Sequence, residues 1–157
     1  MVQASRAADR MTGTYICETP SDTFALGERL GAQLTPGDVL LLKGGLGAGK
    51  TLLTKGILNA LDFDIDEVTS PSFTLVNLYH APTLDVYHID LWRLDENSNT
   101  ASAVGLEEIL ADENNVTIIE WSEKLRSFSH SGRILEISIL GDGDDARTIG
   151  IKSVPSA

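Results

Sequence analysis

Apolar residues occur in two patterns along the chain, a helical spacing and short continuous runs. Three leucines recur every four residues between 26 and 34. They follow Ser21 and Asp22, either of which is suited to cap a helix that begins there. The runs 39–42 and 116–119 are apolar throughout, as expected for strands buried on both faces of a sheet. Helices and strands are therefore mixed along the chain.

The remaining segments extend this α/β pattern. The spacing of apolar residues and the turn-forming residues predict strands at 15–17, 73–80, 84–91, 134–140 and 148–151. They also predict helices at 52–61 and 105–110 and a polar loop at 95–100. In the 73–80 strand, Phe73, Leu75, Asn77 and Tyr79 fall on one face. The order predicts one α/β domain over residues 14–152, with a mixed sheet that has a parallel core and antiparallel additions. We expect residues 1–13 to be a disordered tail and residues 153–157 to be a C-terminal tail.

A glycine-rich motif follows the first buried run. Residues 44–51 read Gly-Gly-Leu-Gly-Ala-Gly-Lys-Thr and match the full pattern G-x-x-x-x-G-K-[ST]. Glycines let the backbone curl so that its N–H groups point at phosphate oxygens, and the next helix begins there with its positive end. Lys50 is suited to reach the β- and γ-phosphates, and the Thr51 hydroxyl to bind Mg²⁺. The motif predicts a P-loop NTPase domain with ATP and Mg²⁺ as ligands, contacted by Gly45, Leu46, Gly47, Ala48, Gly49, Lys50, Thr51 and Leu52.

Polar residues in the strands supply candidates for the second half of such a site. Glu120 ends the buried run 116–119, where a carboxylate can hold Mg²⁺, act through water or serve as the base. The alternative is an ordinary surface glutamate. His88 and Asp90 are two residues apart and share a strand face. They either orient water or Mg²⁺ or form a polar face exposed to solvent.

Composition narrows the classes of function. The 157 residues carry a net charge of −11, from 23 acidic and 12 basic side chains. Such a chain is poorly suited to hold RNA or DNA alone, so the acidity serves either solubility or recognition of a basic partner. Cys17 is the single cysteine, which excludes an internal disulfide and fits a reducing compartment.

No run approaches the roughly 20 apolar residues of a membrane span, and no signal peptide is evident, so we expect a cytoplasmic protein. His80 and His130 have no partners that the sequence identifies, and we expect both to be surface residues.

Five blocks in a fixed order, from about Thr14 to Ile151, resemble the TsaE family: GGLGAGKT, TSPSFTLVNLY, YHIDLWRL, GLEEIL and IIEWSEKL. This family comprises the bacterial ATPases of tRNA threonylcarbamoyladenosine biosynthesis. The resemblance implies that Lys50 and Thr51 hold the phosphates and Mg²⁺, that Glu120 helps to bind Mg²⁺, and that Asp90 is a switch-side aspartate needed for hydrolysis. It further implies nucleotide contacts for Trp121 and, near the adenine, for Thr23, and a mobile switch loop formed by Ser70, Pro71 and Ser72.

The resemblance also implies partners. TsaD and TsaB would form the tRNA-modifying complex, TsaD would transfer the threonylcarbamoyl group, and ATP hydrolysis by this chain would reset the complex. The partners would then hold most of the tRNA. Four residues depart from the family pattern: Gly45, Leu52, Ser72 and Trp92. Gly45 and Leu52 remove polar groups beside the phosphates, which should affect the rate of hydrolysis more than binding.

Two other functions are compatible with the same motif. One is a small-molecule kinase, which usually needs an acceptor pocket and a cationic lid. The arginines that would supply such a lid are scattered, at Arg93, Arg126, Arg133 and Arg147. The other is a binding switch that changes shape with ATP but hardly hydrolyses it. The lack of an N-K-x-D guanine motif disfavours a GTPase.

Overall fold

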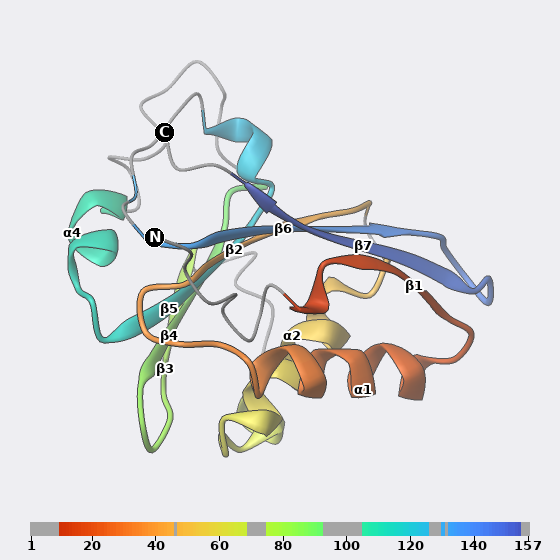
Figure 1. The fold of residues 1–157 in the computed structure, drawn as a ribbon, viewed down its shortest axis with the longest axis horizontal. Coiled ribbons are helices and arrows are strands. Elements are labelled where there is room, and N and C mark those ends of the chain that lie inside the picture. The colour runs from red at the N-terminus through yellow and green to blue at the C-terminus, as the bar shows by residue number, and fades with distance from the viewer. Residues whose placement is uncertain are drawn as a thin grey trace, which may run out of the picture.

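A seven-stranded mixed sheet organises the computed structural model, with strand order β1-β7-β6-β2-β5-β4-β3 (Figure 1). The structure describes residues 10–45, 47–68, 75–92, 105–125, 130 and 132–154. The strands are Gly13–Cys17 (β1), Val39–Lys43 (β2), Val76–His80 (β3), Asp85–Asp90 (β4), Asn115–Glu120 (β5), Ile134–Leu140 (β6) and Arg147–Val154 (β7). The α-helices are Pro20–Gly31 (α1), Lys50–Ala60 (α2) and Leu106–Ala111 (α4), and the 3-10 helices are Ile65–Glu67 (η2) and Ser122–Lys124 (η3).

The predicted mixture of strand directions is confirmed. Strands β6, β2, β5 and β4 run parallel as the core of the sheet. Strands β1 and β7 on one side, and β3 on the other, are added antiparallel. The two hairpins expected from the sequence, β3–β4 and β6–β7, are both present.

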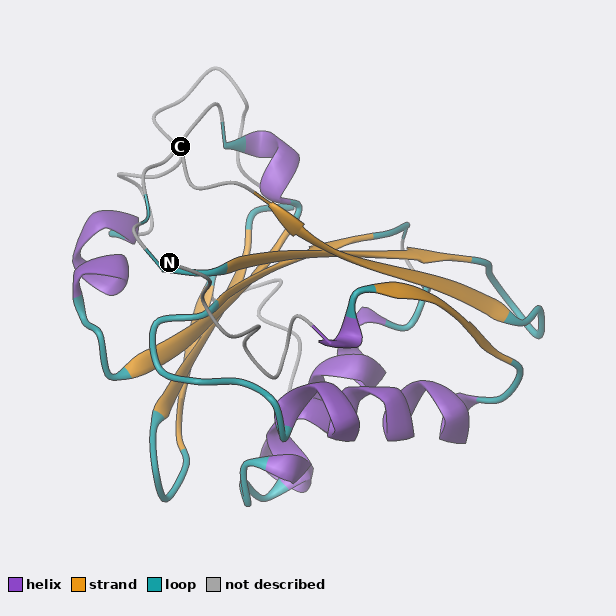
Figure 2. Cartoon of the chain, in the orientation of Figure 1, coloured by secondary structure: helices purple, strands orange, loops and turns teal. Residues whose placement is uncertain are grey.

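Helices cover both faces of the parallel core (Figure 2). Leu40 and Leu42 of β2 point into the larger apolar cluster, which also contains residues of α1 and α2. Val39 and Leu41 point to the opposite face, into a smaller cluster with residues of α4. Burial on both faces explains why the central strands are continuous apolar runs. Among the described helices, none has both the length and the apolar character that crossing a bilayer requires.

Helices α1 and α2 pack with their backbones almost in contact. A Cβ atom on Gly56 would lie 2.2 Å from the Phe24 carbonyl oxygen, and one on Gly27 would lie 2.4 Å from the Leu53 carbonyl oxygen. Neither glycine could carry a side chain without a backbone shift. This close contact holds α2, and with it the end of the glycine-rich loop, against α1.

The start of α1 differs from the prediction. Thr19, rather than Ser21 or Asp22, is the N-cap; its hydroxyl accepts a hydrogen bond from the Asp22 N–H, and the Asp22 carboxylate accepts one from the Thr19 N–H. Pro20 occupies the first turn, where its missing N–H costs nothing. Asp22 is therefore part of a capping box instead of the cap itself.

Ordered structure extends past several predicted limits. Gly13 of β1 pairs with Ile151, and Val154 at the end of β7 pairs with Ile134, so these two strands extend beyond residues 14–152. Met11, placed in the tail by the sequence analysis, is buried in the larger apolar cluster. Helix α2 begins at Lys50, two residues earlier than expected. Strand β3 begins at Val76 because Leu75 has a positive φ of 67°. Phe73 and the expected loop 95–100 lie outside the described residues.

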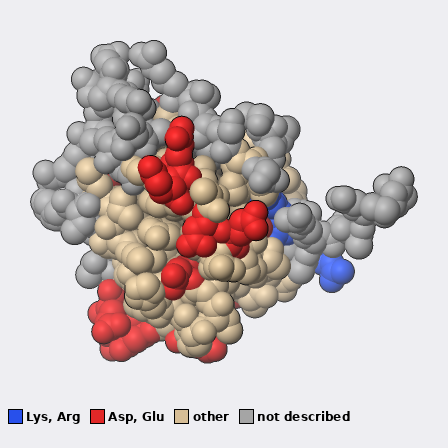
Figure 3. Space-filling model, turned by 90° about the vertical axis from the view of Figure 1, so that its left-hand side faces the viewer, with Lys and Arg blue, Asp and Glu red and all other residues tan. Residues whose placement is uncertain are grey.

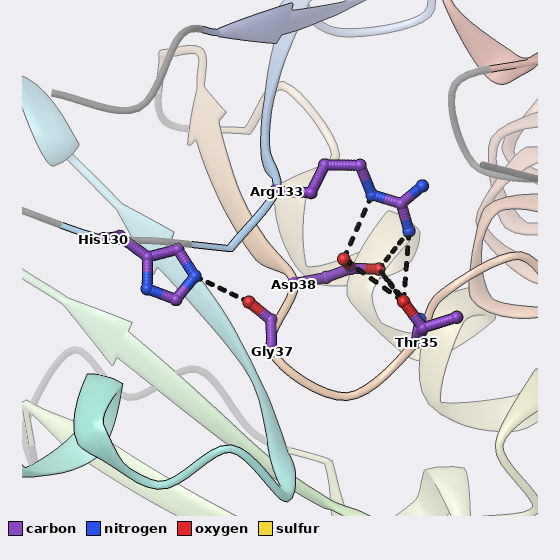
Figure 4. A network of polar contacts seen from close by, with 5 residues as sticks. All are labelled: Thr35, Gly37, Asp38, His130 and Arg133. Carbon is purple, nitrogen blue, oxygen red and sulfur yellow. Dashed lines mark hydrogen bonds and ion pairs between the residues drawn. The ribbon is translucent and has the colours of Figure 1, made fainter. Parts of the chain in front are cut away.

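A buried ion pair anchors the start of β2, at the opposite end from the glycine-rich loop (Figure 4). Arg133 donates two hydrogen bonds to the Asp38 carboxylate, at 3.0 and 2.5 Å, and both side chains are at most 5% exposed. His130 Nε2 lies 2.6 Å from the Gly37 carbonyl oxygen, and His80 Nδ1 lies 2.8 Å from the Asp85 carboxylate. Both histidines therefore have partners that the sequence did not identify, because each meets a group distant from it along the chain or across a turn. The side chain of His80 is 73% exposed, as expected for a surface residue.

Candidate functional site

The glycine-rich loop joins the carboxyl end of β2 to the first residue of α2. Gly47 and Gly49 adopt positive φ angles of 77° and 111°, a backbone region that favours glycine. Gly45 has open space where a side chain would begin, and its φ is not in that region. Leu46 lies outside the described residues, as do Ser70, Pro71 and Ser72 of the expected switch loop. The motif thus stands between a buried strand and a helix, as predicted.

Lys50 is buried at the junction of this loop and α2. Its Nζ atom donates a hydrogen bond of 2.7 Å to the Gly44 carbonyl oxygen and lies 4.4 Å from the centre of the Trp121 ring. Trp121 has a positive φ of 61° directly after β5, and its ring lies 4.7 Å from that of Trp92. The structure therefore brings Trp121 beside the lysine of the motif, from a part of the chain 71 residues away.

Two carboxylates lie at the carboxyl ends of the neighbouring parallel strands. Asp90 of β4 pairs in register with Glu120 of β5, and Glu120 pairs with Leu42 of β2, just before the glycine-rich loop. Both acidic residues are only 3% exposed. Asp90 Oδ1 accepts a hydrogen bond of 2.9 Å from the Trp92 N–H. The alternative of Glu120 as an ordinary surface glutamate is wrong, because the sheet core encloses it.

His88 is the immediate partner of Glu120. His88 Nε2 lies 2.5 Å from Glu120 Oε2, and the histidine is fully buried. Its Nδ1 atom is also buried and has no hydrogen-bond partner among the described residues. The alternative of a solvent-exposed polar face for His88 and Asp90 is wrong, because the two residues are 0% and 3% exposed. A histidine bonded to a carboxylate in this way limits the orientations that the carboxylate can adopt.

The described part of the chain holds no group of three or more His, Cys, Asp or Glu side chains placed to bind a metal ion together. Mg²⁺ does not require such a cage, because it is commonly bound by one or two carboxylates with substrate phosphates and water. Buried Glu120 and the half-buried Thr51 at the start of α2 present oxygen atoms of the suitable kind. The donor set therefore fits a magnesium ion that arrives with a phosphate ligand.

A cavity of about 130 Å³ lies beside the start of α2. It brings together four predicted nucleotide contacts, Thr23, Ala48, Gly49 and Leu52. Thr23 is close to the loop, because a Cβ atom on Gly49 would lie 3.9 Å from its methyl group. The remaining lining residues are Cys17, Glu18, Thr19, Pro20, Gly143, Asp144, Asp145 and Arg147. Burial raises the pKa of the Cys17 thiol above its ordinary value, so the thiol is neutral at pH 7.

The wall of this cavity formed by the β6–β7 hairpin was missed by the sequence analysis. Arg147 was treated as one of several scattered arginines, yet its guanidinium donates hydrogen bonds to the glycine-rich loop. His88 was paired with Asp90 instead of Glu120. No local signal marks either contact, because the partners are 99 and 32 residues apart in sequence.

Comparisons with known proteins agree on one family. Residues 17–149 match the model of the family described as threonylcarbamoyl adenosine biosynthesis protein TsaE. The TsaE protein of Mycobacterium leprae (strain TN) is 43% identical over 124 residues, covering 73% of this chain and 74% of the relative. The TsaE protein of Bacillus subtilis (strain 168) is 36% identical over 135 residues, covering 86% and 82%. The crystal structure of YdiB from Bacillus subtilis superposes with a TM-score of 0.68 at 32% identity, covering 91% of this chain and 86% of that one.

Proposed function

The chain belongs to the TsaE family, and from that premise we propose that it binds ATP·Mg²⁺ and hydrolyses the ATP during threonylcarbamoyladenosine biosynthesis in tRNA. Relatives at 36–43% identity carry tRNA threonylcarbamoyladenosine biosynthesis in their names. The observation that carries the proposal is the convergence of Lys50, the positive-φ glycines and the buried Glu120 at one edge of the sheet. On this proposal the domain is a P-loop NTPase.

The phosphates would lie against the glycine-rich loop and the first turn of α2. Backbone N–H groups and the positive end of the helix attract the anion, and Lys50 would exchange its bond with the Gly44 carbonyl for one with the β- and γ-phosphates. Thr51 and Glu120 would hold Mg²⁺, which neutralises charge that develops on the phosphate oxygens. Lys50 is buried at the junction of the loop and α2, where the phosphates would bind.

Hydrolysis requires a water molecule in line with the bond that breaks between the γ-phosphorus and the ADP oxygen. Asp90 is the last residue of β4 and pairs directly with Glu120 of β5. We assign its carboxylate to orient this water. His88 would hold the Glu120 carboxylate in place through their buried contact. The adenine would occupy the cavity beside Thr23, and the ring of Trp121 would pack beside the nucleotide near Lys50.

The reaction would serve a larger assembly. TsaD and TsaB are the proposed partners, they would hold most of the tRNA, and ATP hydrolysis would reset their complex between turnovers. The net charge of −11 supports this division, because a strongly acidic protein is poorly suited to bind RNA alone. The isolated chain is expected to hydrolyse ATP slowly.

The test compares variants by calorimetry and by phosphate release. The wild type should take up ATP only weakly without Mg²⁺ and more tightly with it. Lys50→Ala should lose ATP binding, whereas Glu120→Gln should bind ATP and fail to turn it over. Lys43→Ala is the matched control, because it removes the same charge from a side chain that is 40% exposed and pairs with Glu136. A wild-type protein without magnesium-dependent ATP uptake would refute the proposal, and turnover by Glu120→Gln at the wild-type rate would refute the role of Glu120.

A further inference from the structure

Arg147 joins the β6–β7 hairpin to the glycine-rich loop. Its Nε and Nη2 atoms donate hydrogen bonds to the carbonyl oxygens of Ala48 and Gly47, at 2.8 and 3.2 Å. On the hairpin side, Nη1 and Nη2 donate to the carbonyl oxygens of Asp145 and Gly143, at 2.5 and 3.1 Å. All four acceptors are main-chain atoms. One planar guanidinium therefore holds two loops, about a hundred residues apart, in a defined relation.

These contacts determine which way the loop peptides face. In a trans peptide the carbonyl oxygen and the following N–H point in opposite directions, and the described residues contain no cis peptide bond. A carbonyl of Ala48 held toward Arg147 therefore directs the Gly49 N–H away from the hairpin. The carbonyl of Gly47 likewise orients the Ala48 N–H, which donates to the Gly45 carbonyl oxygen at 3.2 Å.

The loop needs such an external constraint. Gly47 and Gly49 have no side chains to restrict them, and glycine populates many backbone conformations. The position of Arg147 is well defined, because it pairs with Cys17 of β1 at the start of β7. Gly141 leaves room for its side chain, since a Cβ atom there would lie 3.0 Å from Arg147 Cδ. A rigid strand end thus restrains a permissive loop.

We propose that Arg147 is a positioning residue for phosphate binding: it fixes the peptide orientations of the glycine-rich loop and thereby sets the affinity for a nucleoside di- or triphosphate. This inference rests on the proposed function. Arginine suits the role because its rigid fork donates to several acceptors at once, whereas a lysine ammonium acts as a point charge. Removing the fork leaves the Gly47 and Ala48 carbonyls without these donors and lets the peptides rotate.

The test uses Arg147→Ala and Arg147→Lys, with Lys152→Ala as the control that removes one positive charge from an exposed position on the same strand. Arg147→Ala should bind ATP and ADP about tenfold more weakly, a loss of about 1.4 kcal/mol. AMP affinity should change less, because AMP offers the loop amides a single phosphate. Arg147→Lys keeps the charge and should restore only part of the ATP affinity. Lys152→Ala should bind ATP like the wild type.

A second measurement does not depend on nucleotide binding. In the ligand-free protein, NMR relaxation of the Ala48 and Gly49 amides should show greater mobility in Arg147→Ala than in the wild type. Unchanged mobility, or wild-type ATP affinity in Arg147→Ala, would overturn the inference. Equal losses in Arg147→Ala and Lys152→Ala, or full restoration by Arg147→Lys, would overturn it in favour of a simple charge effect. A wild type that binds no ATP would instead refute the proposed function, while the mobility result would still decide the role of Arg147.

Discussion

Individual residues at this site depend on partners from other strands. A glutamate that is 3% exposed has little contact with water, so its carboxyl group needs a hydrogen-bonding partner from the protein. His88 provides that partner through Nε2. The pair resembles the outer-shell arrangements in which a second residue orients a metal ligand. His88 therefore influences the proposed magnesium site without belonging to its ligands.

His88→Ala should weaken the magnesium dependence of ATP hydrolysis. Loss of outer-shell contacts typically costs about 10–100-fold in metal affinity or activity, and we expect a change of that size in the Mg²⁺ concentration needed for half-maximal turnover. His88→Gln keeps an N–H donor and should recover part of the loss. Phosphate release measured against Mg²⁺ concentration gives the answer.

His80→Ala is the control for this prediction, since His80 is an exposed histidine on the adjacent strand β3. Thermal unfolding of each variant separates a positioning effect from loss of the fold. A His88→Ala protein that remains folded and keeps the wild-type response to Mg²⁺ would show that the contact with Glu120 has no functional part.

At the scale of elements, the contact between α1 and α2 determines where the glycine-rich loop can lie. Gly27 and Gly56 allow the two helix backbones to meet. Gly31 adds a third close approach, because a Cβ atom on this residue would lie 2.5 Å from the Ile57 carbonyl oxygen. Helix α1 also contributes Thr23 to the cavity, and α2 carries Lys50 and Thr51. A change in the spacing of the two helices would therefore separate the proposed adenine and phosphate sites.

Gly56→Ala should destabilise the protein although alanine favours a helix by about 1 kcal/mol over glycine. The added methyl group would meet the Phe24 carbonyl oxygen at 2.2 Å, a contact that only a backbone shift can relieve. Overpacking of this kind costs about 1–3 kcal/mol. Chemical denaturation measures the change, and Gly150→Ala is the control, because nothing lies within 4 Å of a Cβ atom there. Equal stability of Gly56→Ala and the wild type would contradict the backbone contact.

At the scale of the whole molecule, acidic side chains outnumber basic ones on one described face. The side that carries α4 shows several patches of acidic side chains and few basic ones on its described surface (Figure 3). Exposed acidic residues of α4 and the turn after it are Glu107, Glu108, Asp112 and Glu113. Charge of one sign speeds association with a surface of the opposite sign and makes it sensitive to salt. If the charge serves only solubility, the association rate with a partner is not expected to depend on salt.

Binding to the proposed TsaD and TsaB partners should therefore weaken as ionic strength rises, mainly through a slower association rate. Replacing Glu107, Glu108 and Glu113 with lysine should reduce the association rate further at low salt. The same exchange at Asp62, Asp64 and Asp66 alters net charge equally and serves as the control. Surface plasmon resonance measures both. A rate that does not respond to salt would leave solubility as the role of the charge, and equal effects of the two triple variants would assign it to net charge alone.

Much of the fold and part of the site could be predicted from local patterns. Apolar runs marked the parallel core, turn chemistry marked the two hairpins, and eight consecutive residues marked the glycine-rich connection. These features depend on residues close together in sequence, because the spacing of apolar residues and the conformational preferences of single residues determine local structure. The starts of α1 and β3 differ from the prediction, because Thr19 caps α1 and Leu75, with its positive φ, stands just before β3.

By itself, the sequence determined the succession of strands and helices along the chain, the glycine-rich loop with Lys50, and the family to which the motifs belong. Only the tertiary structure decided the partners: Glu120 for His88, the glycine-rich loop for Arg147, and the backbone of α1 for Gly56. The physical reason is the sheet, whose order places strands side by side without regard to their distance along the chain. The partner of a side chain is then determined by the register and packing of neighbouring strands. A local sequence pattern cannot predict either, because both depend on residues that are distant along the chain.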